Sequence, residues 1–108
     1  PEDPSYRFLA GACALRAGDK GTALEHFEQG VETETAPFRR GQLLLWGSRA
    51  ADAAGKPAAA RSLRAELRGT RHPLLACHRE AAVKEETRPY PAAKLQSAVP
   101  QTVLVDVM

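Results

Sequence analysis

The chain has few of the residues that most function classes require. Among its 108 residues only 6% are aromatic, and there are two cysteines, one tryptophan and one methionine. The formal charge of +2 is too small for the basic stripe that a nucleic-acid-binding domain carries. No run approaches the roughly 18 apolar residues that a membrane-spanning helix needs. We therefore expect no nucleic-acid partner and no membrane span.

The two cysteines exclude little by themselves. Cys13 and Cys77 are far apart in the sequence and follow neither a metal-binding nor a redox spacing. Both lie among alanine and leucine residues, where a buried free thiol is the usual arrangement. We expect two buried free thiols, and a disulfide between them stays an open alternative.

Alanine is abundant, and the apolar residues recur at helical spacing, which predicts an all-α fold. Glycine and proline break this pattern at Gly18, Pro37, Gly55 and Pro73. The predicted helices between the breaks cover residues 6–17, 20–34, 38–54, 58–68 and 74–86. Residues 92–98 have room for two further helical turns.

The predicted helices form two pairs whose sequences repeat. Equivalent residues lie 36 positions apart in the two pairs: Gly11 and Gly47, Ala23 and Ala59, Phe27 and Leu63, Val31 and Leu67. A helix–turn–helix period of about 34 residues is the mark of tetratricopeptide repeats. A small residue in the first helix lets the second helix approach, and a bulky residue in the second fills the space between units.

The chain resembles the tetratricopeptide family over residues 5–69. It departs from the family's motif at Ala14 and Ala50, where an aromatic residue is usual, and at Glu66, where a small residue is usual. The resemblance implies antiparallel helix pairs stacked as a short right-handed array. It places the repeats within residues 1–88, followed by an extended tail. The expected parts are units at 5–35 and 37–69, a capping helix at 74–86 and the tail at 89–108.

In tetratricopeptide-like folds the first helix of each pair lines a concave groove that binds peptides. Carried over to this sequence, the resemblance implies a candidate groove formed by Ser5, Phe8, Ala12, Arg16, Leu44, Ser48 and Asp52. The function that it implies is a non-catalytic protein–protein interaction or scaffolding module with a protein or peptide partner.

A second resemblance is to the superhelical region of bacterial soluble lytic transglycosylases. It is carried by residues 42–50, by Gly55-Lys56-Pro57, by Ala59 and Arg61, and by His72-Pro73-Leu74. It implies a periplasmic scaffold for a peptidoglycan-cleaving domain that is absent from this chain. Without this resemblance we expect a cytoplasmic location.

No arrangement of reactive residues predicts catalysis, a cofactor or a metal. His72, Cys77 and His78 lack the fourth ligand that a structural zinc site needs. Acid–base work needs a desolvated carboxylate with a raised pKa. We instead expect solvated surface positions for the carboxylate pairs Glu25/Glu28, Glu32/Glu34 and Glu85/Glu86.

Three further features have a structural and a functional interpretation. Arg61, Arg64 and Arg68 share one helix face, which we expect to be a solvated surface partly paired with Asp52 and Glu66, or else a contact for an acidic partner. Trp46 is expected in the core rather than in a ligand site. Valines alternate over residues 102–108, which suits a strand, so residues 99–108 are a candidate for self-association with a neighbouring chain.

Overall fold

The computed structural model of the chain describes residues 4–98, and every regular element in this range is helical. This confirms the all-α prediction for the described residues. The elements in chain order are α1 (Pro4–Arg16), α2 (Lys20–Thr33), α3 (Pro37–Ala53), α4 (Pro57–Gly69), the 3₁₀ helix η1 (Pro73–Leu75), α5 (Ala76–Thr87) and α6 (Ala92–Ala98).

The helix ends lie where the sequence carries capping and breaking residues. Gly18 and Gly55 have φ angles of 86° and 75°, in the left-handed region that glycine adopts without a steric penalty. The side chain of Asp19 caps α2 by accepting a hydrogen bond from the Thr22 amide at 3.1 Å. Pro37 and Pro57 occupy the first positions of α3 and α4, where their missing N–H groups have no helical partner to lose.

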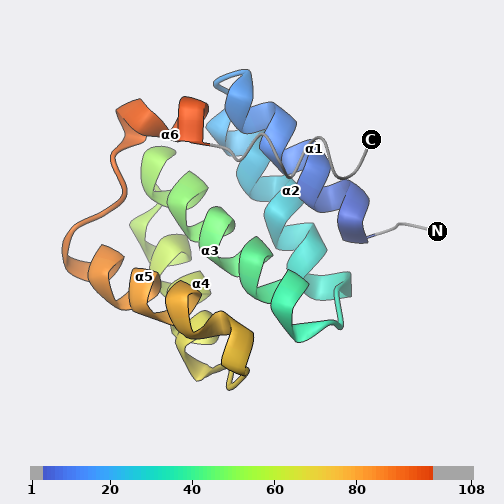
Figure 1. The fold of residues 1–108 in the computed structure, drawn as a ribbon. Helices are drawn as coiled ribbons and strands as arrows, with labels where there is room; N and C mark the ends of the chain where they lie inside the picture. Colours follow the sequence, from blue (N-terminus) through green and yellow to red (C-terminus); the bar gives the residue numbers. More distant parts are fainter. Residues whose placement is uncertain (1–3, 99–108) are drawn as a thin grey trace.

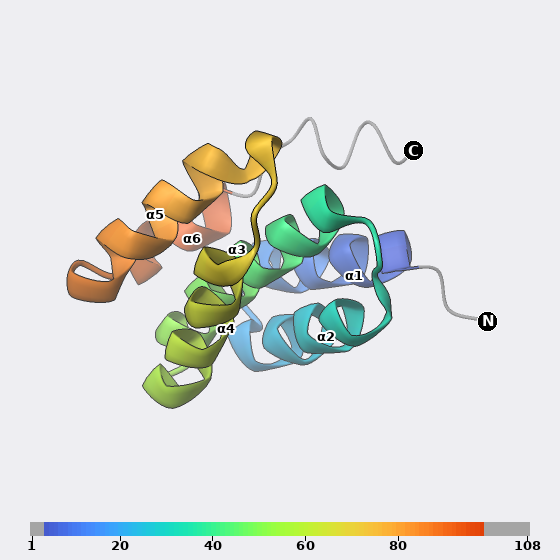
Figure 2. The ribbon, with the colours of Figure 1, turned by 90° about the horizontal axis from the view of Figure 1, so that it is seen from below.

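Consecutive helices pack against one another from α1 to α5. Figure 2 shows α1, α3 and α5 on one side of the molecule and α2 and α4 on the other. Helix α3 is central, because it contacts α2, α4, α5 and α6. Its residues 43–48 are all buried, and Trp46 is among them at 8% exposed, as predicted.

The predicted tail is not an extended segment throughout. Residues 92–98 form α6, which turns back over the body of the protein and packs on α1 and α3 (Figure 1). Leu95 of α6 is only 1% exposed and belongs to the hydrophobic core. The predicted strand and self-association segment, residues 99–108, lie outside the described residues.

The repeated glycines are positions of close approach between helices. A Cβ atom added at Gly11 would lie 2.6 Å from Cε1 of Phe27, with two further ring carbons at 2.8 Å. A Cβ added at the equivalent Gly47 would meet Leu63 and Phe27 at 3.3 Å. The first contact requires the buried Phe27 ring to move, whereas the second requires shifts of a few tenths of an ångström.

We therefore expect Gly11→Ala to destabilise the fold by about 1–3 kcal/mol, because overpacking outweighs the gain in helix propensity. Gly47→Ala is the matched control and should change the unfolding free energy by less than about 1 kcal/mol. Urea unfolding followed by circular dichroism measures both. Equal losses in the two variants would contradict the assignment of Gly11 as the tighter contact.

Candidate functional site

Three of the predicted groove residues are buried in the core. Ala12 is 1% exposed, and Leu44 and Ser48 are 0% exposed. The Ser48 hydroxyl donates a hydrogen bond of 2.7 Å to the carbonyl of Leu45 in its own helix. The expectation that these three line an open groove is therefore wrong, because neighbouring helices cover these faces of α1 and α3.

The other predicted groove residues do not form one surface. The Phe8 ring is half-buried, with its centroid 5.8 Å from that of Phe27. Asp52 accepts a hydrogen bond of 2.6 Å from Arg64, and Arg16 is exposed at the end of α1. Ser5 lies in the first turn of α1, and its side chain is outside the described residues.

A different face of α3 is turned toward the last segment of the chain. Gln42, Trp46, Arg49 and Ala53 recur along it at helical spacing. The Arg49 guanidinium carbon lies 4.8 Å from the ring centroid of Trp46 and 4.3 Å from that of Tyr90. Both distances suit a cation–π contact.

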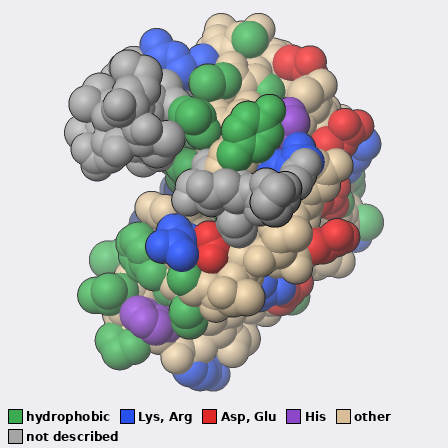
Figure 3. Space-filling view, turned by 90° about the vertical axis from the view of Figure 1, so that its right-hand side faces the viewer, with side chains coloured by type: hydrophobic (Ala, Val, Ile, Leu, Met, Phe, Trp, Pro, Cys, Tyr) green, Lys and Arg blue, Asp and Glu red, His purple; other side chains and the backbone are tan. Residues whose placement is uncertain are grey.

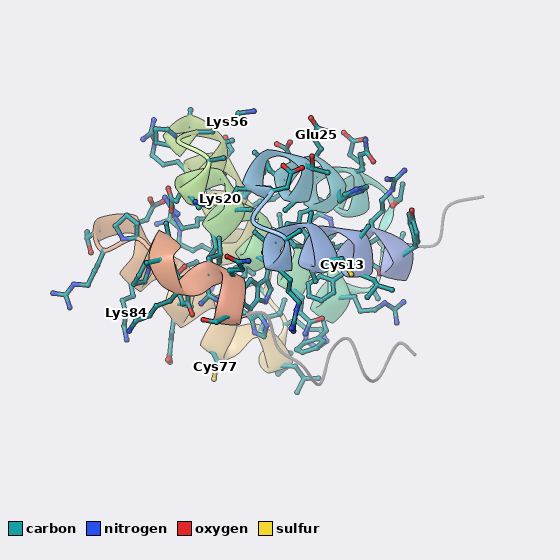
Figure 4. All side chains as sticks on the ribbon, turned by 90° about the horizontal axis from the view of Figure 1, so that it is seen from above. Cys13, Lys20, Glu25, Lys56, Cys77 and Lys84 are labelled. Carbon is teal, nitrogen blue, oxygen red and sulfur yellow. The ribbon has the colours of Figure 1, made fainter. Side chains whose placement is uncertain are left out.

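Helix α6 packs on α1 and α3, beside the C-terminal end of α1 (Figure 4). The Gln96 side-chain amide donates a hydrogen bond to the carbonyl of Arg16, the last residue of α1. That carbonyl has no partner within its own helix, so α6 caps α1. We call the surface of α1 and α3 that carries α6 and Tyr90 the inner face; its described contacts involve Arg16, Trp46 and Arg49.

Arg49 is held in place by α5. Its Nε and Nη2 atoms donate hydrogen bonds of 3.0 and 2.8 Å to the two carboxylate oxygens of Glu85, whose side chain is 8% exposed. The expectation of a solvated Glu85 is wrong, because burial of this carboxylate is offset by a bidentate partner. Sequence reasoning missed the pair, because its two residues are 36 positions apart on different helices and no local pattern connects them.

Glu34 also departs from the expected solvated position. It is 5% exposed in the turn between α2 and α3, where it accepts hydrogen bonds from the amides of Thr35 and Ala36 at 3.1 Å and from Arg39 at 2.9 Å. Burial raises the pKa of the Glu34 carboxyl, but the hydrogen bonds outweigh burial, and the net pKa lies below its usual value.

The predicted basic face on α4 is interrupted by a buried ion pair. The Arg64 side chain is 3% exposed and donates hydrogen bonds to Asp52 at 2.6 Å and to Glu86 at 3.0 Å. The pairing with Asp52 is confirmed, whereas Glu66 pairs with Arg40 instead. Arg64 is therefore not a solvated residue, because α5 covers it and supplies the second carboxylate.

Next to Arg49 the surface carries a pocket of about 460 Å³ between α5 and the segment that follows it. Tyr90 and its flanking prolines form one wall, and α5 forms the other. Its lining residues are Arg49, Cys77, Glu80, Ala81, Lys84, Glu85, Arg88, Pro89, Tyr90 and Pro91. Such a pocket suits an apolar side chain, with charged groups from α5 at its rim.

Both cysteines are free and exposed, so the prediction of buried thiols is wrong. Cys13 shares the outward face of α1 with Tyr6 and Arg16, and Cys77 lies on the outward face of α5. Figure 4 shows the two cysteines on separate helices. Alanine-rich surroundings in the sequence misled the prediction, because the nearby Ala17 and Ala76 are themselves exposed.

The large exposed apolar residues do not define a site. Tyr6, Leu74 and Val83 are more than half exposed, but they belong to α1, η1 and α5. Figure 3 shows charged side chains among the hydrophobic ones on the face it presents. Scattered apolar residues of this kind are ordinary on protein surfaces.

Within residues 4–98, no group of three or more His, Cys, Asp or Glu side chains is placed to hold a metal ion. None of the described helices combines the length and apolarity that crossing a bilayer requires. His78 lies edge-on to Phe38, with ring centroids 5.4 Å apart. Burial, together with the charge of Arg49, lowers the pKa of His78 below its usual value of 6.5.

We expect the charge pair between α3 and α5 to contribute measurably to stability. Glu85→Gln leaves Arg49 without its carboxylate and should cost about 1–3 kcal/mol of unfolding free energy. Glu80→Gln, on the same helix but exposed, should change it by less than about 0.5 kcal/mol. Urea unfolding compares the two, and equal effects would show that the buried pair contributes nothing beyond a surface charge.

We also expect stability to decrease as the pH falls below about 6.5. In the unfolded chain His78 takes up a proton at its ordinary pKa, whereas in the folded chain its pKa is lower. The unfolded state then binds more protons, so the unfolding free energy rises with pH through this window. Urea titrations at about pH 5.5 and 7.5 should show a smaller pH dependence in His78→Gln than in the wild type. The same slope in both proteins would contradict this assignment.

The site therefore consists of the inner face and the adjoining pocket, joined by Arg49 and Tyr90. Comparisons with family models, with curated proteins and with solved structures returned no match to this chain. No relative therefore bears on either resemblance seen in the sequence. The site is defined by its geometry in this structure alone.

Proposed function

We propose that the chain is a non-catalytic interaction module whose helix pairs α1–α2 and α3–α4 are two units of a tetratricopeptide-like array. In this proposal the inner face takes up a segment of a protein or peptide partner. The observation that carries it is α6, a helix of seven residues that lies across α1 and α3. A short helical segment is thus already seated on the face where the proposal places the ligand.

The polar contacts of α6 support the same interpretation. Gln96 meets the terminal carbonyl of α1, and Leu95 enters the core. One apolar anchor combined with a hydrogen bond to the backbone is a common way for a helical groove to hold a peptide. The face therefore has the chemistry that peptide recognition uses.

The charged residues of the site are placed for a structural role rather than a catalytic one. Arg49 is bound to both oxygens of Glu85, and Arg64 is bound to Asp52 and Glu86. Groups paired in this way hold neighbouring helices in position. The resemblance to lytic transglycosylase scaffolds stays a prediction beside this proposal.

A peptide library displayed on phage and selected on the full chain tests the proposal. The Arg49 guanidinium contacts Tyr90 on the inner face, so Arg49→Gln should weaken a selected peptide at least about tenfold, as loss of a contact residue does. Arg64→Gln is the matched control: it removes another arginine that is paired with a carboxylate of α5, but it lies on α4 and should leave the affinity unchanged. Failure to select any peptide, or equal binding to both variants, would overturn the proposal.

A further inference from the structure

We propose that residues 89–97, called the strap here, act as an intramolecular ligand of the inner face that a partner peptide must displace. The partner that fits carries an aromatic residue followed five positions later by leucine, as Tyr90 and Leu95 do in the strap. This inference rests on the proposed function. It specifies the ligand of the inner face and how binding of that ligand is regulated.

The strap is held at few points. Leu95 is its buried residue and Tyr90 is half-buried, while all its other residues are exposed. Helix α6 has only seven residues, which is too short to be stable by itself in water. One buried leucine, one stacked ring and the hydrogen bond of Gln96 must therefore offset the entropy lost in ordering the whole segment. Elements with so few buried contacts open before the rest of a domain unfolds.

The surface beneath the strap does not depend on the strap for its shape. Glu85 fixes the Arg49 guanidinium from α5 through two hydrogen bonds, and the Trp46 ring supports it from α3. When the strap leaves, Arg49 keeps these partners and presents one face where Tyr90 had been. The opening also exposes the core site that Leu95 fills. A preformed site of this kind binds without the cost of ordering its own residues.

The contacts of the strap define the chemistry of the partner. An aromatic ring recognises the Arg49 guanidinium through its face. A leucine five residues later reaches the site of Leu95, and a hydrogen-bond donor next to it reaches the Arg16 carbonyl. Because the strap is part of the same chain, its effective concentration is far above that of a free peptide, so the wild-type chain discriminates against weak ligands.

The test uses the full chain and a synthetic peptide with the sequence of residues 88–97. Leu95→Ala removes the apolar anchor of the strap in the protein but not in the peptide. The peptide should bind this variant at least about tenfold more tightly than it binds the wild type. Leu74→Ala, which truncates an exposed leucine of η1, is the matched control and should bind like the wild type. Trp46 is the only tryptophan, so its fluorescence reports the titration.

A peptide in which the leucine is replaced by aspartate should fail to bind Leu95→Ala. Equal affinities of all three proteins for the unmodified peptide would overturn the proposal, as would no binding to a Leu95→Ala variant that still unfolds cooperatively. A wild-type dimer that Leu95→Ala dissociates would assign the face to a second copy and also overturn it. If the peptide fails to bind while a phage-selected ligand remains sensitive to Arg49→Gln, only the role of the strap is rejected and the proposed function stands.

Hydrogen exchange of the wild type gives a second measurement in case Leu95→Ala does not fold. The amides of α6 should exchange at least about tenfold faster than those of α3, because the strap opens without global unfolding. Exchange of α6 only at the rate of global unfolding would overturn the proposal.

Discussion

Four helices, α2, α4, α5 and α6, pack against helix α3. The rest of the structure depends on covering the apolar residues of α3 and pairing its charged ones. Where α3 meets another helix closely, it carries glycine: a Cβ at Gly41 would lie 2.3 Å from Leu75, and Gly47 lies against Leu63 and Phe27. Where it carries a charge, a neighbour must supply the opposite charge, because an unpaired ion cannot be buried without a large penalty. Arg49 therefore requires α5 to bring Glu85 to it.

The two ends of the molecule are consequently held by different interactions. The first four helices associate through an apolar core that includes Leu24, Phe27 and Leu43, with small residues at the contacts. Helix α5 is held by ion pairs that reach Arg49 and Arg64, together with the buried Ala82 and the contact of His78 with Phe38. Buried pairs tolerate the loss of one partner poorly, so α5 is sensitive to single substitutions. Beyond it, the strap rests on one leucine, one aromatic ring and one hydrogen bond, and it is the least firmly attached described segment.

Much of the fold was predictable, because it depends on signals that act over a few residues. The predicted helix at 20–34 corresponds to Lys20–Thr33, and the one at 58–68 to Pro57–Gly69. The candidate groove was less predictable. The predicted groove residues of α3 were Leu44, Ser48 and Asp52, whereas the face toward the strap carries Trp46 and Arg49. A central helix has apolar residues in every direction, so hydrophobic periodicity cannot show which side remains open.

The sequence by itself determined the helical class, the breaks at Gly18 and Gly55 and the repeated small positions, because backbone conformation and side-chain size act locally. Only the tertiary structure decided which charges are buried and which thiols are exposed. The burial of Glu85 depends on Arg49, and that of Arg64 on Glu86, each from another helix. The packing of α6 on α1 and α3 likewise depends on the tertiary structure, since Gln96 and the Arg16 carbonyl are 80 residues apart in the sequence. Such contacts follow from how helices are placed, which no local pattern records.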